Sequence, residues 1–141
     1  MNETLRNELL ALVQKDLETR SRLRDDARLY GRYDERMQQV HRDNAQRLDA
    51  LIAAHGWPGV SLVGEEGADA AWLVAQHAIC TPALQRRFLP LLAAAVEAGE
   101  APSRQVAMLT DRIRFHEGRP QVFGTVLDWD ESGRLSCEVE D

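Results

Sequence analysis

Cysteine is scarce in this sequence: its 141 residues include two, Cys80 and Cys137. They lie far apart, and neither belongs to a CxxC pair, so their spacing does not indicate a zinc-binding or redox motif. We expect both to be free thiols in a reducing compartment. The neighbours of Cys80 are apolar, which predicts that this side chain belongs to the core.

Long hydrophobic runs are also missing. The longest strongly apolar run, Phe88 to Val96, is far shorter than the roughly 20 residues that a membrane-spanning helix needs. The first ten residues, MNETLRNELL, lack the basic segment and uninterrupted apolar run of a signal peptide. These absences predict a cytoplasmic protein that does not associate with a membrane.

Positive charge is in deficit as well. The 17 Lys and Arg residues against 23 Asp and Glu residues give a net charge of −6. This balance opposes nonspecific binding to nucleic acid, which requires a basic surface. The arginines between residues 20 and 47 are interleaved with acidic residues, so a solvated helix of mixed charge is favoured over a basic patch. Nucleic acid is therefore not an expected partner.

Several sequence motifs that identify enzymes are absent, including GxxxxGK[ST], HExxH and GxSxG. A metal site would need at least three converging His, Cys or carboxylate ligands. His77 with Asp16 or Asp111 would supply them only through tertiary contact. From the sequence we therefore assign no metal ligand, and the cofactor, if there is one, is unknown.

What the sequence does contain is helical periodicity. Its hydrophobic content of 44% and charged content of 28% are typical of a globular protein, and residues 1–141 suffice for a single domain with a core. Apolar residues recur at helical spacing in five segments. The helices we expect span residues 3–28, 34–54, 68–80, 82–98 and 103–116. The first two would form an N-terminal helical hairpin within residues 1–54, and the helical core would occupy residues 66–116.

The last part of the chain has a different pattern. The segments QVFGTVLDW and LSCEVE contain strand-forming residues, and DESG between them supplies turn residues. This predicts a β-hairpin over residues 120–140 that packs on the helices, because a lone hairpin is only marginally stable. The expected fold is mainly α, a bundle-like single domain of about five helices with a small C-terminal β-hairpin.

Polar residues interrupt the apolar helix faces. Asn44 lies in the middle of an apolar stripe, and Asp16 lies one helical turn from Arg20. Burying such groups without partners costs roughly 1–3 kcal/mol per neutral group. We therefore predict that they meet in one polar cluster. Its expected members are Asp16, Arg20, Asn44, His77, Asp111, Arg112 and Gln121. A surface ion pair at Asp16 and Arg20, or a purely structural hydrogen bond at Asn44 or His77, remains an alternative at each position.

The other histidines are interpreted as non-functional. His41 and His116 lie in charged surroundings, which predicts that both are exposed to solvent. His55 follows a predicted helix end, where an imidazolium ion is favourable. His77, surrounded by alanines and aliphatic residues, is the histidine that we expect at a functional site.

Three segments form an ordered set of motifs: HGWPGVSLVGEEGADAAWLVAQHA, LQRRFLPLL and AMLTDRIRFHEGRPQVFGT. Together they resemble an uncharacterised bacterial family, the domain of unknown function numbered 6624, over most of the chain. The resemblance implies no activity, but it singles out the residues that match the family pattern. These are Trp57, Gly64, Gln76, His77, Gln85, Asp111, Arg112, Gln121, Gly124 and Thr125. Phe123 stands where the family usually has Tyr, Val126 stands where it usually has Gln, and the final EVED replaces a longer, arginine-containing segment.

Two functional hypotheses follow. In the first, the chain is an enzyme or binds a small polar or anionic ligand, and the predicted catalytic residues are His77 and Asp111. His77 would act as acid, base or ligand, oriented by Asp111 or Asp16. A guanidinium would hold an anionic group. The residues predicted to bind the ligand are Arg20, Asn44, Gln76, Gln85, Arg112, Gln121 and Thr125. In the alternative, the chain is a noncatalytic protein–protein interaction module, such as a homodimer formed through the N-terminal helices, and the polar cluster is structural.

Overall fold

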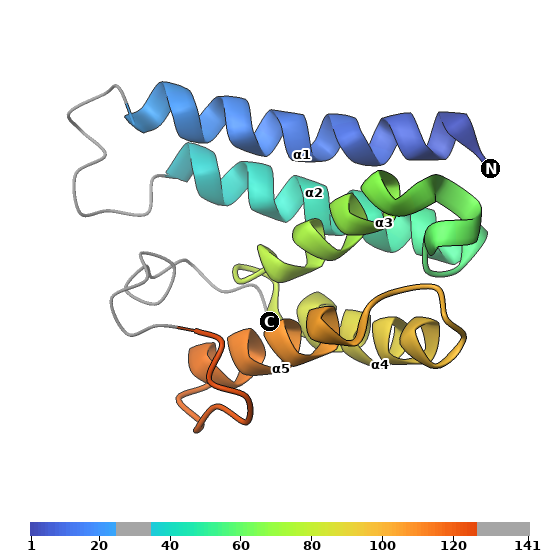
Figure 1. The fold of residues 1–141 in the computed structure, drawn as a ribbon. Coiled ribbons are helices and arrows are strands. Elements are labelled where there is room, and N and C mark those ends of the chain that lie inside the picture. The colour runs from blue at the N-terminus through green and yellow to red at the C-terminus, as the bar shows by residue number, and fades with distance from the viewer. Residues whose placement is uncertain (25–34, 127–141) are drawn as a thin grey trace.

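The computed structural model describes residues 1–24 and 35–126, which form a bundle of helices (Figure 1). The helices are α1 (Glu3–Arg24), α2 (Glu35–His55), α3 (Val60–Gln76), α4 (Pro82–Glu97) and α5 (Ser103–His116). α1 and α2 lie side by side and antiparallel, α3 crosses beneath them, and α4 and α5 form the opposite side of the bundle. The prediction of a mainly α fold is confirmed.

The first two helices follow the sequence pattern closely. The Asn2 side chain caps α1, because its Oδ1 accepts a hydrogen bond of 3.0 Å from the backbone N–H of Leu5. Along α2 the buried face includes Met37, Asn44 and Leu48, which recur at helical spacing. Beyond the end of α2, Gly56 has a φ of 76°, a value that glycine adopts without strain. Local sequence signals therefore account for the beginning of α1 and the end of α2.

The start of α3 corrects the prediction that this helix begins at residue 68. The helix begins at Val60 and bends at Gly64, where φ is 75° and ψ is 173°. The Glu100 side chain caps it: its carboxylate accepts hydrogen bonds from the Ser61 backbone N–H at 2.7 Å and from the Ser61 hydroxyl at 2.6 Å. The cap comes from a residue 39 positions later in the chain, so local sequence gave no sign of it.

The turn from α3 to α4 sets the direction of His77. α3 ends at Gln76 rather than at residue 80, and His77 is its C-terminal cap residue. Gln85 on α4 reaches back to this end, where its Nε2 donates hydrogen bonds to the backbone oxygens of Ala75 at 3.1 Å and Gln76 at 3.2 Å. These bonds satisfy carbonyl groups that a helix end leaves without partners. Pro82 occupies the first turn of α4, as predicted.

The main core lies where the helices meet. It is built from leucine, alanine and aromatic side chains that the periodic stripes turn inward. Its fully buried members include Leu9, Leu48, Ala71, Ala75, Phe88, Leu92 and Leu109. The small side chains on α3 allow this central helix to pack closely against its neighbours.

The predicted β-hairpin over residues 120–140 is not supported. Residues 121–126 form no strand, and residues 127–141 lie outside the described part of the chain. The backbone N–H groups of Val122, Phe123 and Thr125 bind the carboxylate of Asp111 instead of a partner strand. Residues with high strand propensity are thus held in a loop by one buried side chain, which overrides the local preference.

Candidate metal centre

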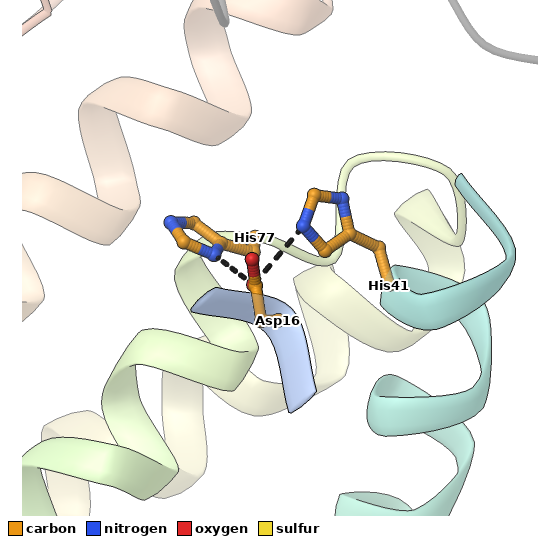
Figure 2. Close-up of side chains that lie close together, drawn as sticks. All are labelled: Asp16, His41 and His77. Atoms are coloured by element: carbon orange, nitrogen blue, oxygen red, sulfur yellow. Dashed lines mark hydrogen bonds and ion pairs between the residues drawn. The ribbon is translucent and has the colours of Figure 1, made fainter. Parts of the chain in front are cut away.

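Three helices bring one carboxylate and two imidazoles together. Asp16 comes from α1, His41 from α2 and His77 from the C-terminal end of α3 (Figure 2). Oδ2 of Asp16 lies 2.7 Å from Nδ1 of His77 and 3.1 Å from Nε2 of His41. One ligand atom from each residue lies within 4.8 Å of the other two. A group arranged in this way could hold one metal ion after small movements of its side chains.

The cluster is buried on one side and reached by solvent on the other. The side chains of Asp16 and His41 are 6% and 5% exposed, whereas that of His77 is 22% exposed. Nε2 of His77 points away from Asp16 in Figure 2, while Nδ1 faces the carboxylate. His77 therefore forms the accessible edge of the cluster.

The Asp16 carboxylate is held in its ionised form. Burial by itself raises the pKa of this group, but hydrogen bonds from His41 and His77 outweigh burial and bring the pKa far below its ordinary value. Its second oxygen, Oδ1, is buried and accepts no hydrogen bond among the described residues. Asp16 thus keeps a full negative charge, with part of its acceptor capacity unused.

His77 is held in its neutral form. Burial lowers the pKa of His77 below its ordinary value of 6.5 and outweighs the hydrogen bond and charge of Asp16, which raise it. The charges of His41 and Arg20 lower it further. A neutral imidazole is the form that binds metal ions or accepts a proton.

His41 corrects a sequence prediction. Its charged neighbours in the sequence predicted exposure, yet its side chain is among the most buried polar groups. The signal for burial was present, since Met37, His41, Asn44 and Leu48 are spaced by four, three and four residues, which is the period of one helix face. His116, the other histidine predicted to be exposed, is half-buried.

Buried amides fix the helices that carry the cluster. Asn44 on α2 donates a hydrogen bond from Nδ2 to the backbone oxygen of Leu12 on α1 at 2.9 Å. Gln76, next to His77, donates from Nε2 to the backbone oxygen of Met108 on α5 at 3.1 Å. With Gln85, these side chains were predicted to bind a ligand. The structure places all three amides in contacts between helices, where they hold Asp16, His41 and His77 in register.

Arg20 lies beside the cluster. Its Nε is 3.8 Å from Oδ1 of Asp16, one helical turn earlier, and its side chain is 40% exposed. The predicted pairing of Asp16 with Arg20 is therefore present, although the distance is too long for a hydrogen bond. Arg20 places a positive charge beside the Asp16 carboxylate.

Asp111 belongs to a second polar group. Its Oδ1 accepts hydrogen bonds from the backbone N–H groups of Val122 and Phe123 at 2.8 and 2.9 Å, and Oδ2 accepts two more from Thr125. Burial raises the pKa of Asp111, but these bonds outweigh burial and lower it. The structure joins this carboxylate to the loop rather than to the histidines, so the single predicted cluster is divided in two.

The remaining predicted residues accompany Asp111. Gln121 closes the same loop, since it donates to the backbone oxygen of Val126 at 2.8 Å and accepts from its N–H at 2.9 Å. Thr125 donates its hydroxyl to Asp111 at 2.9 Å. Arg112 is half-buried next to Asp111 on α5.

The sequence prediction did not include His41 in the polar cluster. It did include Asp16, which contacts His77 in the structure.

Comparison with known proteins gives a family without an assigned activity. Residues 3–134 match the model of the Family of unknown function (DUF6624). The chain belongs to this family. Neither curated proteins nor solved structures gave a match. In the part of this DUF6624 chain that the structure describes, no helix has the length and apolar character required to cross a bilayer.

The pH dependence of stability offers a test of the buried state of His77. Because burial lowers the pKa of His77 in the folded chain, the unfolded chain binds this proton more readily, and we expect stability to fall as the pH drops below about 6.5. One such proton changes the free energy of unfolding by at most about 1.4 kcal/mol per pH unit. Urea unfolding between pH 7.5 and 5 in the presence of a chelator measures this slope.

The control for this experiment is His55, which is exposed at the end of α2. His77→Gln should flatten the slope between pH 6.5 and 5, whereas His55→Gln should leave it unchanged. An identical slope for His77→Gln and the unaltered chain would show that His77 is not buried in its neutral form.

Proposed function

We propose that Asp16, His41 and His77 bind a divalent transition metal ion such as Zn²⁺, and that the chain is an enzyme that uses this ion to act on a small polar molecule. The observation that carries the proposal is the convergence of three ligand atoms from three helices within 4.8 Å. Two hydrogen bonds to one carboxylate oxygen already hold the ligands around a common point. The cluster is accessible to solvent along His77.

The donor set suits this class of metal. Two imidazole nitrogens and one carboxylate oxygen are ligands of Zn²⁺ and of other first-row ions such as Fe²⁺. In a tetrahedral zinc site, adjacent ligand atoms lie about 3.3 Å apart, given metal–ligand distances of about 2.0–2.1 Å. The separations of 2.7 and 3.1 Å between Oδ2 of Asp16 and the two imidazole nitrogens would require only a small outward movement of the imidazoles. Three protein ligands leave a coordination position open, which is the arrangement of catalytic rather than structural zinc sites.

The protonation states favour binding. The lowered pKa of Asp16 supplies a negative charge, and the lowered pKa of His77 supplies a neutral imidazole. Without metal, Nδ1 of His77 and Nε2 of His41 donate to Asp16. To hold a metal ion, those nitrogens would present their lone pairs to it, and each ring would carry its proton on the other nitrogen. Binding therefore exchanges two hydrogen bonds for metal–ligand bonds without exposing a charge.

A metal at this position would supply the nucleophile that the side chains lack. Bound Zn²⁺ lowers the pKa of a coordinated water to about 7, so a hydroxide forms near neutral pH. In a hydrolysis, such a water would lose one proton to solvent and its oxygen would form the new bond to the electrophilic atom. The leaving group would depart with its bonding electrons and take up a proton. The thiol of Cys80 is buried in a separate apolar cluster that also contains Leu23 and Met37.

The proposal also assigns roles that differ from those that the sequence predicted. His77 stays in the proposal, as a metal ligand rather than as an acid or base. Asp16 replaces Asp111 as the carboxylate beside it. Asn44, Gln76 and Gln85 act as positioning residues, because their hydrogen bonds join the helices that carry the ligands. Asp111, Gln121 and Thr125 organise the loop that follows α5.

Zinc titration tests this proposal directly. We expect the chain to bind one Zn²⁺ per molecule in a competition assay with a chromophoric chelator. His77→Ala should weaken binding at least about 100-fold, because it removes one of three ligands, a larger change than the 10- to 100-fold loss usual for outer-shell partners. His77 is the most exposed ligand, so this variant is the one expected to retain the fold.

Two other histidines provide matched controls. His55→Ala and His116→Ala remove imidazoles that lie outside the cluster, and both should bind Zn²⁺ within about twofold of the unaltered chain. Circular dichroism establishes that each variant is folded. A folded chain that binds no zinc, or a folded His77→Ala variant with unchanged affinity, would overturn the proposal and favour the alternative of an interaction module with a structural polar cluster.

A further inference from the structure

Resting on the proposed metal centre, we infer that the molecule taken there carries an oxyanion, a phosphate or carboxylate group, which the Arg20 guanidinium binds beside the metal. The inference names the substrate class that the site selects. It follows from the position of Arg20, from the bonding capacity that this side chain leaves unused, and from the charge of the loaded site.

Position is the first argument. Arg20 follows Asp16 by one turn of α1, so both side chains lie on the same face of the helix. Nε of Arg20 lies 3.8 Å from Oδ1 of Asp16, the carboxylate oxygen that does not face the histidines. A guanidinium at this distance lies close to the carboxylate that would hold the metal ion. Its 40% exposure leaves it accessible from solvent.

Unused bonding capacity is the second argument. A guanidinium has five N–H donors in a rigid planar fork. Within residues 1–24 and 35–126, Arg20 makes an ion pair with Asp16 and donates no hydrogen bond. Arg47 and Arg87, by contrast, are engaged by the carboxylates of Glu8 and Asp49. Arg20 therefore keeps donors for a ligand, and the fork matches the paired oxygens of a phosphate or carboxylate.

Charge is the third argument. In the loaded site the histidines are neutral, and the single negative charge of Asp16 offsets only half of the metal's charge. Arg20 adds a further positive charge on the accessible side. The electrostatic potential at the loaded site would thus be positive, although the whole chain carries a net charge of −6. A partly buried positive site attracts an anion more strongly than the same charges in water would.

The experiment uses Co²⁺ in place of Zn²⁺, because its visible absorption spectrum reports both its own binding and the arrival of a further ligand. The full chain is loaded with Co²⁺ and titrated separately with inorganic phosphate and with acetate, at constant ionic strength. We expect saturable spectral changes. The oxyanion that binds more tightly identifies the source of the negative group, as a phosphate or as a carboxylate.

Two arginine variants of the same helix then isolate the role of Arg20. Arg20→Gln should weaken binding of the preferred anion at least tenfold while leaving Co²⁺ affinity within about threefold, and Arg20→Lys should give an intermediate loss. Arg22→Gln is the matched control, since Arg22 forms the equivalent ion pair with Glu18, at 4.0 Å, and is 76% exposed. This variant should bind the anion normally.

The outcomes separate the two proposals. If the chain gains no Co²⁺ spectrum, the metal centre fails and the inference fails with it. If Co²⁺ binds but neither anion alters the spectrum, or if Arg20→Gln and Arg22→Gln bind the anion equally well, the metal centre stands and the role of Arg20 is overturned.

Discussion

Replacement of Asp16 by alanine is expected to lower the free energy of unfolding by about 3 kcal/mol without metal, and by about 6 kcal/mol when Zn²⁺ is present at 100 times its Kd. The first figure reflects two lost hydrogen bonds to a buried charged group, each contributing about 1.5 kcal/mol or more. The second value is larger because a ligand at 100 times its Kd stabilises a folded chain that binds it by about 2.7 kcal/mol. The alanine variant would gain little of it.

Urea unfolding with and without Zn²⁺ measures both terms. Glu18→Ala is the control, because Glu18 is an exposed carboxylate on the same helix, paired with Arg22 at 4.0 Å. Such a surface pair contributes roughly 0–1 kcal/mol, and its loss should not depend on zinc. Asp16→Asn separates the two effects further: it keeps one acceptor oxygen for the imidazoles but removes the charge that the metal needs.

Each result bears on a different part of the proposal. If the deficit of Asp16→Ala were the same with and without zinc, Asp16 would have only a structural role. If Asp16→Ala were as stable as Glu18→Ala in the absence of metal, the hydrogen bonds of the cluster would not contribute to the fold.

Hydrophobic periodicity predicted the positions of most of the helices. Leu5 and Leu9 on α1, and Leu48 and Leu51 on α2, are buried as their spacing indicates. Periodicity failed at the start of α3, because the capping carboxylate of Glu100 is distant in sequence. It failed again after α5, where Asp111 takes backbone hydrogen bonds that a β-strand would have given to a neighbouring strand.

The site was harder to predict than the fold because it depends on which helix faces meet. The sequence indicated that His77 and Asp16 were buried polar residues in need of partners. It also offered Asp111 as an equally plausible carboxylate for His77, and only the packing of α1 against α3 decides between the two. For His41, the helical spacing with Met37 and Leu48 was the informative signal, and the charged neighbours Arg42 and Asp43 were misleading.

The residues that the sequence singled out by their resemblance to the family pattern divide between two structural tasks. Gln76 and His77 lie at the end of α3, where the Gln76 side chain contacts α5 and the His77 side chain contacts Asp16. Asp111, Gln121 and Thr125 form the loop-organising group. A motif residue is therefore not by itself a site residue: its contacts decide whether it positions backbone or faces a ligand.

Asp111→Ala is expected to lower the free energy of unfolding by about 3 kcal/mol and to release the loop of residues 121–126. Asp111 is fully buried, and its carboxylate accepts four hydrogen bonds from the loop. Loss of the carboxylate leaves three backbone N–H groups without their acceptor. Each hydrogen bond to a charged group contributes about 1.5–3 kcal/mol, but rearrangement of the loop lets water replace part of this contribution. Amide hydrogen exchange at Val122, Phe123 and Thr125 should become fast.

Zinc binding decides whether this loop group is separate from the metal centre. Asp111→Ala should keep its Zn²⁺ affinity within about twofold, because the proposed ligands come from α1, α2 and the end of α3. Thr125→Val, which removes only the hydroxyl among the four donors, should cost about 1 kcal/mol and leave the backbone amides protected. A large loss of zinc affinity in a folded Asp111→Ala variant would instead place Asp111 with His77, as the sequence first indicated, and would make the two polar groups a single site.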